Sequence, residues 1–264
     1  MIWRQSAERK VDAPILEDVS AGALPPVAPE EPVYAVGDLH GRVDLLTEML
    51  ERLDADMLSR GRDEAQVVFL GAYVDRGDHT AEVLEWMHWL SWEYDGRVVC
   101  LKGNHEAMML DFLVDPEGRG PRWLRNGGLQ TLASYGIGGL TERAPAAELL
   151  MAAERLRAAL PEGLEDWLRD LPLTWGSGNL VCLHAAADPA QPIEAQDPAT
   201  LLWGHRDFLS GVRSDGVWIA HGHTVVDEPE GAAGRIAVDT GACFTGRLTA
   251  AAVYPGDDVR FLST

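Results

Sequence analysis

The chain has 264 residues, of which 46% are hydrophobic and 24% are charged. These are ordinary globular values and exclude disorder for most of its length. A formal net charge of −20 argues against extended contact with a nucleic-acid backbone, which needs a basic face. A small anionic substrate stays possible if metal ions or a few arginines supply local positive charge. No apolar run approaches the roughly 18 residues that span a bilayer. We therefore expect a cytoplasmic protein with no membrane partner.

The first 32 residues differ from the rest of the chain. They are rich in Pro, Ala and Glu and show no sustained hydrophobic period. This composition predicts a flexible or surface-draped leader over residues 1–32. One folded domain is then expected over residues 33–264.

Short apolar runs that end in polar loops alternate with helical patterns from Val33 onward. In chain order they read "VYAVGD", "VDLLTEMLERLDADML", "QVVFLG", "TAEVLEWMHWLSWEY" and "RVVCLKGN". In the first helical pattern the apolar residues follow i, i+3, i+4 spacing, so one face is buried. The alternation predicts a βαβαβ arrangement with right-handed crossovers and a mostly parallel sheet.

The remainder of the chain divides into two parts. Residues 107–170 pass from a Gly/Arg-rich stretch into Ala/Leu/Glu helices, which predicts a helical insertion over one end of the sheet. After Pro172, strand candidates separated by glycine turns dominate, and we expect them to supply a second sheet. The fold class expected is α/β, a four-layer αββα sandwich with a helical insertion over the active-site end.

Chemically active side chains follow several predicted strands directly. The loops are "GDLHG", "GAYVDRG", "GNHE", "LHA" and "AHGHT". Ligand groups gather beyond the carboxyl ends of strands in sheets of this kind. Carboxylate, imidazole and amide ligands without a thiolate suit divalent Mn, Fe or Zn. Three successive strand ends followed by two more histidine loops therefore predict a metal site.

This series of motifs resembles that of the calcineurin-like metallophosphoesterases. The resemblance is to the branch with phosphoprotein serine/threonine phosphatases and bacterial diadenosine tetraphosphate hydrolases. It runs in order from Gly37 to Thr224, and "VDTGACFTGRLTA" resembles the closing segment of that branch. It implies that Asp38 and His40 bind a first metal ion. Asn104, His184 and His223 would bind a second one, and His221 would lie beside the ligands.

The resemblance also implies how a phosphate would be held and cleaved. Arg76 would grip the phosphate, together with Asn104 and His105. His105 would protonate the leaving oxygen while Asp75 orients it. A second phosphate arginine is expected after "LLW", and we assign it to Arg206. The two cations, manganese first and iron or zinc as alternatives, would promote in-line attack of water on phosphorus without a phosphoenzyme.

One position departs from the family pattern. The second motif in the family reads Gly-Asp-x-Val-Asp-Arg-Gly, and its first aspartate bridges both metals, but this chain has Ala72 there. A methyl group cannot coordinate a cation, so the form as written is expected to be impaired. Either the aspartate was replaced deliberately, giving an inactive mutant, or a natural member lost catalysis. The intact Asp75, Arg76 and His105 favour a deliberate replacement.

Three functions stay open at this point. The first is a serine/threonine-phosphoprotein phosphatase or general phosphomonoesterase, whose partner is a phosphorylated protein or small phosphoester. The second is a hydrolase of diadenosine tetraphosphate or related nucleotides. The third is a binding protein that recognises phosphate without cleaving it. A pocket built by Arg119, Arg122, Trp123 and Arg125 would favour nucleotides, although these residues could equally form a solvated surface.

Overall fold

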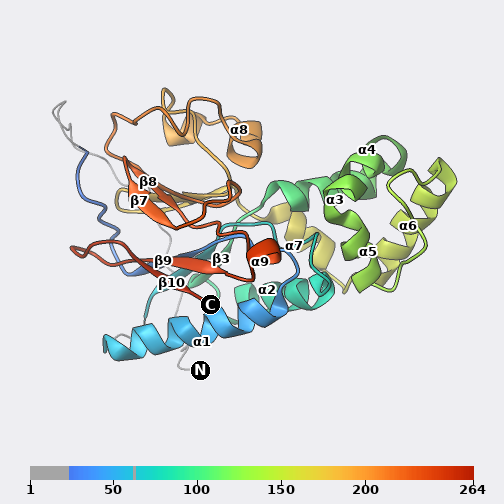
Figure 1. Cartoon of the computed structure of the whole chain (residues 1–264), viewed down its shortest axis with the longest axis horizontal. Helices are drawn as coiled ribbons and strands as arrows, with labels where there is room; N and C mark the ends of the chain where they lie inside the picture. Colours follow the sequence, from blue (N-terminus) through green and yellow to red (C-terminus); the bar gives the residue numbers. More distant parts are fainter. Residues whose placement is uncertain (1–23, 62–63) are drawn as a thin grey trace.

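A computed structural model describes residues 24–61 and 64–264, and in it two five-stranded sheets face one another (Figure 1). The first sheet has the order β10-β9-β1-β2-β3. Its strands are β1 (Val33–Val36), β2 (Gln66–Phe69), β3 (Val98–Cys100), β9 (Thr249–Val253) and β10 (Arg260–Ser263). β1, β2 and β3 are parallel, as the alternation of apolar runs and helices predicts. β9 and β10 add an antiparallel edge.

The second sheet has the order β4-β5-β6-β8-β7. Its strands are β4 (Thr174–Ser177), β5 (Leu180–Leu183), β6 (Trp218–His221), β7 (Glu230–Ala232) and β8 (Arg235–Ala237). β5, β6 and β8 are parallel, whereas β4 and β7 are antiparallel to their neighbours. The carboxyl ends of parallel strands in both sheets are therefore available to build a site.

Helices cover the outer faces of the sheets and one end of the sandwich (Figure 1). α1 (Val43–Ser59) and α2 (Thr80–Glu93) lie against the first sheet, and α8 (Pro198–Trp203) lies over the second. Most of the helical segment at the end of the sandwich is formed by α3 (Asn104–Val114), α4 (Pro116–Trp123), the π-helical turn η1 (Leu124–Gly128), α5 (Leu129–Ser134), α6 (Ala146–Ala159) and α7 (Leu164–Asp170). The short helices η2 (Ile193–Ala195) and α9 (Ala242–Thr245) complete the set described.

Alternation along the strands separates the four layers. Tyr34 and Val36 of β1 face the helices of the first sheet, whereas Val33 and Ala35 face the second sheet. On the outer face of the second sheet, Ile219 packs with Leu201 of α8. Because successive strand side chains point to opposite faces, each sheet buries one apolar surface against helices and one against the other sheet. This confirms the predicted four-layer αββα arrangement, with helices at one end.

The last two strands correct one expectation. The chain after Pro172 does not form the second sheet alone, because β9 pairs antiparallel with β1 and returns the chain to the first sheet. The sequence of β9, "TAAAV", is buried on both faces. Small apolar residues on both faces mark a central strand but do not tell which sheet it joins.

The described part of the expected leader, residues 24–32, lies against the second sheet. Asn179 holds it through both ends of its amide, with Ala28 N donating to Oδ1 at 2.6 Å and Nδ2 donating to Pro26 O at 3.0 Å. Trp218 Nε1 donates to Pro25 O at 2.7 Å. Residues 24–32 are thus draped over the surface by hydrogen bonds. The rest of the expected leader, 1–23, lies outside the described residues.

The lengths and compositions of the helices bear on membrane insertion. Within residues 24–61 and 64–264, no helix has both the length and the apolarity that a bilayer crossing requires.

A substitution at Gly71 tests how closely the loops after β2 and β3 approach one another. The φ of Gly71 is +100°, and a methyl group there would lie 2.6 Å from Gly103 N and 3.1 Å from His184 Nδ1. Gly71→Ala should lower the free energy of unfolding by about 2 kcal/mol more than Gly96→Ala does. Gly96 also has a positive φ (+76°), but no described atom lies within 4 Å of the added methyl group. Chemical denaturation of both variants would measure the difference, and equal losses would contradict the close approach.

Candidate metal and phosphate site

Loops from both sheets meet at the carboxyl ends of the parallel strands. Asp38 and His40 follow β1, Ala72 to Arg76 follow β2, and Asn104 begins α3 just after β3. His184 follows β5 and His223 follows β6. The first two loops are joined directly, because Leu39 N and His40 N both donate to Ala72 O, at 3.2 and 2.8 Å. The predicted clustering of strand-end residues is therefore present.

Glu106 ties the second loop to the third. Its buried carboxylate accepts hydrogen bonds from Ala72 N at 2.9 Å, Tyr73 N at 2.7 Å and Gly103 N at 2.8 Å. Burial raises the pKa of Glu106, and these backbone donors act against that shift. A carboxylate satisfies several closely spaced N–H groups that no secondary structure could pair. Glu106 therefore fixes the loop that carries Ala72.

The backbone of the site is unusually rich in left-handed residues. Of the described non-glycine residues with positive φ, all but Ala233 belong to these loops: His40, Ala72, Asp75, Arg76 and His223. Such conformations are costly for L-residues, and they persist only where the surroundings impose them. Aspartate and histidine tolerate this region better than alanine does. The backbone at Ala72, with φ +54°, therefore suits an aspartate.

His40 presents one nitrogen to the site. Its Nδ1 lies 2.8 Å from Val74 O, and burial lowers the pKa of the imidazole well below its usual value, so the neutral ring donates Nδ1–H to that carbonyl. The Nε2 lone pair then points toward Asp38 Oδ2 at 3.9 Å and accepts from Arg76 Nη1 at 3.3 Å. Metal-binding histidines are commonly held in this way, with one nitrogen on a carbonyl and the other free to coordinate.

His184 repeats the arrangement on the other side. Its Nδ1 lies 2.8 Å from Leu70 O, while Nε2 lies 2.9 Å from Asn104 Oδ1. Burial lowers the pKa of His184, so a neutral ring that donates through Nδ1 turns a lone pair toward the amide oxygen. A cation between these two acceptors would satisfy both. His223 completes the group, with its ring centroid 5.1 Å from that of His184.

The donor set fits a pair of divalent metal ions with one ligand missing. Asp38 and His40 form one group, and Asn104, His184 and His223 form the other. Within the described part of the chain, no three His, Cys, Asp or Glu side chains form a group that could hold a metal ion. Asn104 is not among those residue types, and position 72, between the groups, carries only a methyl. The donor set therefore lacks a carboxylate at position 72.

A second carboxylate lies near the first group. Asp239 follows β8, and a Cβ at Gly37, next to Asp38, would lie 3.4 Å from the Asp239 Cα. Burial, and then the charge of Asp239, raise the pKa of Asp38 well above its ordinary value. Arg76 acts in the opposite direction on both carboxyl groups. Two buried carboxylates so close together repel one another when both are ionised, and a bound cation would offset that repulsion.

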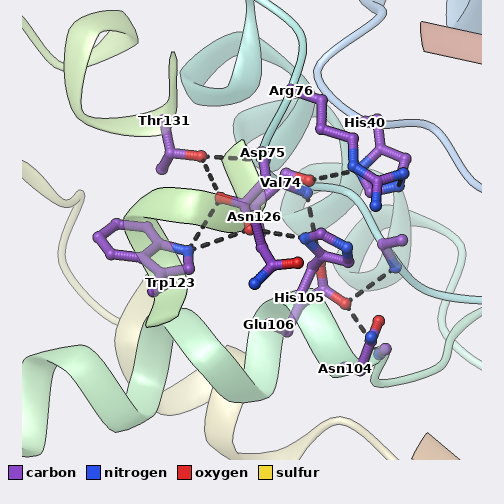
Figure 2. A network of polar contacts seen from close by, with 12 residues as sticks. His40, Val74, Asp75, Arg76, Asn104, His105, Glu106, Trp123, Asn126 and Thr131 are labelled. Carbon is purple, nitrogen blue, oxygen red and sulfur yellow. Dashed lines mark hydrogen bonds and ion pairs between the residues drawn. The ribbon is translucent and has the colours of Figure 1, made fainter. Parts of the chain in front are cut away.

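The residues expected to handle phosphate lie beside these ligands. His105 Nδ1 is 2.7 Å from Asp75 Oδ2, and its ring lies edge-on to that of His40 at 4.5 Å (Figure 2). Burial, followed by the charges of Arg76 and His223, lowers the pKa of His105 to about 3. In the free protein its Nε2 therefore carries a lone pair. Negative phosphate at the site would raise this pKa and allow the ring to take a second proton.

Two residues, Arg206 and Trp123, stand elsewhere than the sequence suggested. Arg206 is not brought to the cluster: its side chain is 89% exposed and pairs with Asp207, because the chain turns at Gly204 after α8. Trp123 does not line a nucleotide pocket, because it is fully buried and its indole N–H donates to Asp75. His221 is buried against Phe208 at 5.0 Å between ring centroids, which agrees with its exclusion from the ligands.

Sequence reasoning missed the parts played by Glu106, Thr131 and Asp239. Glu106 stood in the quoted "GNHE", and its place at the third position of a helix is a known capping signal. Asp239 stood in "VDTG" after a strand, the same signal that marked Asp38. Thr131 offered no signal, since a threonine inside a helical pattern most often bonds its own helix.

Removing the charge of Glu106 should loosen the site. In Glu106→Gln an amide NH2 would face backbone N–H donors, so we expect the free energy of unfolding to fall by about 2–3 kcal/mol. The matched control is Glu48→Gln, whose exposed pair with Arg52 should cost no more than about 0.5 kcal/mol. Guanidinium denaturation measures both. A loss in Glu106→Gln as small as in the control would show that the tie is dispensable.

Comparison with known proteins agrees with this geometry. The chain shares its fold with a putative diadenosine tetraphosphatase, at a TM-score of 0.58 and 18% identity, covering 88% of this chain and 93% of the other. It also resembles a serine/threonine phosphatase from Saccharomyces cerevisiae with similarity to human PP5, at a TM-score of 0.53 and 16% identity, covering 89% of this chain and 80% of the other.

Sequence relatives match a shorter stretch. A protein phosphatase 2A catalytic subunit from Dictyostelium discoideum is 33% identical over 79 residues, which is 30% of this chain and 23% of the relative. Serine/threonine-protein phosphatase BSL2 from Arabidopsis thaliana is 33% identical over 82 residues, 31% of this chain and 8% of the relative. The matched stretch thus spans less than a quarter of these relatives. The family profile described as calcineurin-like phosphoesterase matches residues 31–234, and the chain belongs to that family.

Proposed function

We propose that this protein is a metal-dependent phosphomonoesterase that acts on phosphoserine and phosphothreonine in proteins, and that Ala72 impairs it. The observation that carries this proposal is the meeting of five metal-ligand candidates with Arg76 and the Asp75–His105 pair at one edge of the sandwich. Members of the family to which the chain belongs are phosphoesterases, and the short matched stretch is shared with serine/threonine phosphatases. A cytoplasmic location fits such a substrate.

Each residue would have a distinct task. Asp38 and His40 would hold one cation, and Asn104, His184 and His223 the other. Two divalent ions, with manganese preferred to iron or zinc, would activate water and offset phosphoryl charge when bound. These residues are already oriented by contacts to backbone carbonyls and to one another.

The phosphate and the leaving group would be handled by the residues beside the ligands. Arg76 would bind phosphate oxygens, because its half-buried guanidinium lies at the site between His40 and the ring of Phe244, whose centroid is 5.3 Å from Cζ. His105 would deliver a proton from Nε2 to the leaving oxygen while Asp75 holds Nδ1. The exposed Arg206 has no role in this proposal.

Ala72 accounts for the expected impairment. The residue is fully buried, its amide is held by Glu106, and its φ of +54° is one that aspartate adopts more readily than alanine. An aspartate here would place a carboxylate between the two ligand groups. Without it, two cations would share no anionic ligand and would repel one another.

A nucleotide substrate is the second candidate. Arg122 of α4 lies over the ring of Trp203 of α8 at 4.1 Å, and together they form a stacked cation and indole. Such a surface can take a base, because bases stack on aromatic rings and guanidinium planes. One structural neighbour is described as a putative diadenosine tetraphosphatase. A third candidate, phosphate recognition without cleavage, would apply to the form with Ala72.

Restoring the carboxylate tests the proposed function. Ala72→Asp should hydrolyse p-nitrophenyl phosphate in the presence of manganese at least ~100-fold faster than the chain with Ala72, because loss of a catalytic metal ligand typically costs that much or more. Removal of metal by a chelator should abolish the gain. Comparable activity of the two forms, or none in the restored form, would contradict the bridging role of position 72.

A substrate panel on the Ala72→Asp variant separates the candidates. We expect kcat/KM for phosphoserine and phosphothreonine peptides to exceed that for diadenosine tetraphosphate by at least ~10-fold. Trp203→Ala should then leave peptide hydrolysis unchanged. If the nucleotide is the better substrate and Trp203→Ala lowers only its hydrolysis, the second candidate replaces the first.

A further inference from the structure

The carboxylate of Asp75 is buried among donors from α3, α4 and α5 (Figure 2). Its Oδ2 lies 2.7 Å from His105 Nδ1. Trp123 Nε1 donates to both carboxylate oxygens, at 2.9 and 3.0 Å, and Thr131 Oγ1 donates to Oδ1 at 2.8 Å. Every one of these side chains is buried. Trp123 ends α4 and Thr131 lies in α5, so two helices outside the sandwich supply these contacts.

The same segment also holds the backbone of the loop. Thr131 Oγ1 accepts from Asp75 N at 2.9 Å, so one hydroxyl contacts both the main chain and the side chain of Asp75. Gly127 O accepts from Arg76 N at 3.2 Å, and a methyl at Gly127 would lie 2.6 Å from that nitrogen. The kinked segment η1, in which Gly127 has a left-handed φ of +108°, is therefore packed directly onto the two residues.

Asp75 and Arg76 need such support because of their conformation. Their φ values are +73° and +69°, and a left-handed backbone at two consecutive non-glycine residues persists only when neighbours impose it. Burial also raises the pKa of Asp75, whereas the hydrogen bonds from Thr131 and Trp123 oppose this shift. The hydrogen bonds to Trp123, Thr131 and His105 together fix the orientation of the Asp75 carboxyl group.

We infer that Trp123 and Thr131 are positioning residues for the leaving-group step: they hold Asp75, which orients His105 so that its Nε2 meets the leaving oxygen. This inference rests on the proposed function. It assigns to the helical segment the orientation of His105 through Asp75, which the strand-end loops alone do not provide. Neither residue contacts the substrate in this account. The proton passes from His105 Nε2 to the ester oxygen as the P–O bond breaks, and Trp123 and Thr131 keep their own protons throughout.

The dependence on leaving group provides one test. In the Ala72→Asp background, Trp123→Phe keeps an aromatic ring but loses the N–H, and Thr131→Val keeps the shape but loses the hydroxyl. Each should lower kcat for phenyl phosphate by roughly 10- to 100-fold, the usual cost of losing a group that orients another. Hydrolysis of 2,4-dinitrophenyl phosphate, whose leaving group needs no proton, should change by less than about 3-fold. Trp92→Phe, at an indole 74% exposed, is the matched control.

A measurement that needs no activity provides the second test. In the chain with Ala72, nitrogen-15 NMR of labelled histidine should show His105 protonated at Nδ1 with a downfield proton, the mark of a strong bond to a carboxylate. That signal should shift or broaden in Trp123→Phe and Thr131→Val and stay unchanged in Trp92→Phe. Thermal unfolding of each variant shows whether it is folded. If Trp123→Phe is not folded, the His105 signal of Thr131→Val alone tests the inference.

The outcomes separate the inference from the proposed function. Equal losses with both esters, or a His105 signal unaltered in both variants, would overturn the positioning role. If the Ala72→Asp protein hydrolyses neither ester, the proposed function fails instead. The NMR comparison then still decides whether the helical segment orients His105.

Discussion

The buried carboxylate of Glu106 is the contact on which the rest of the site depends. It accepts hydrogen bonds from backbone N–H groups of the loop after β2 and of the residue just before α3. These amides are turned away from any strand or helix, so without the carboxylate they would be buried and unpaired. The tie places the start of α3 directly beside Ala72. As a result, the first turn of one helix supplies a ligand candidate, Asn104, and the proposed acid, His105, together with the residue that fixes them.

The backbone around this contact stores strain that regular structure elsewhere offsets. Consecutive left-handed residues at Asp75 and Arg76 let the loop turn its carboxylate inward while its guanidinium reaches toward His40. An extended loop could not aim neighbouring side chains in this way. The strain is sustained by contacts from three directions: the loop after β1, the start of α3, and the helical segment through Trp123 and Thr131. Such over-determination is what keeps a costly conformation in place.

The sequence predicted well what depends on strand ends and poorly what depends on tertiary contacts. Asp38, Asn104 and His184 follow apolar runs, and the edges of parallel strands converge, so their clustering could be foreseen. The sequence around Trp123 did not indicate that its indole N–H would donate to Asp75, so a pocket lined by Trp123 remained possible. The structure does not bring Arg206 to the cluster, because Gly204 and His205 separate it from Trp203 in a turn whose direction the sequence does not specify. The assignment of β9 to the second sheet was wrong, because its alanines carry no preferred face.

Position 72 carries a methyl group instead of a carboxylate, so this residue places no anionic side chain between the two groups of ligand candidates. The ligand candidates stand in two groups, Asp38 with His40 and Asn104 with His184 and His223, and Arg76 donates to His40 where a cation would otherwise be expected. Under the proposed function, these two groups would hold two metal ions, and the carboxylate that would join them is missing.

Anomalous diffraction from crystals of the Ala72→Asp protein grown with manganese tests this account most directly. We predict two peaks, one beside Asp38 and His40 and the other beside Asn104, His184 and His223, roughly 3.5–4 Å apart with the new carboxylate between them. Peaks that lie elsewhere, or a single ion that leaves either group of ligands uncoordinated, would contradict it.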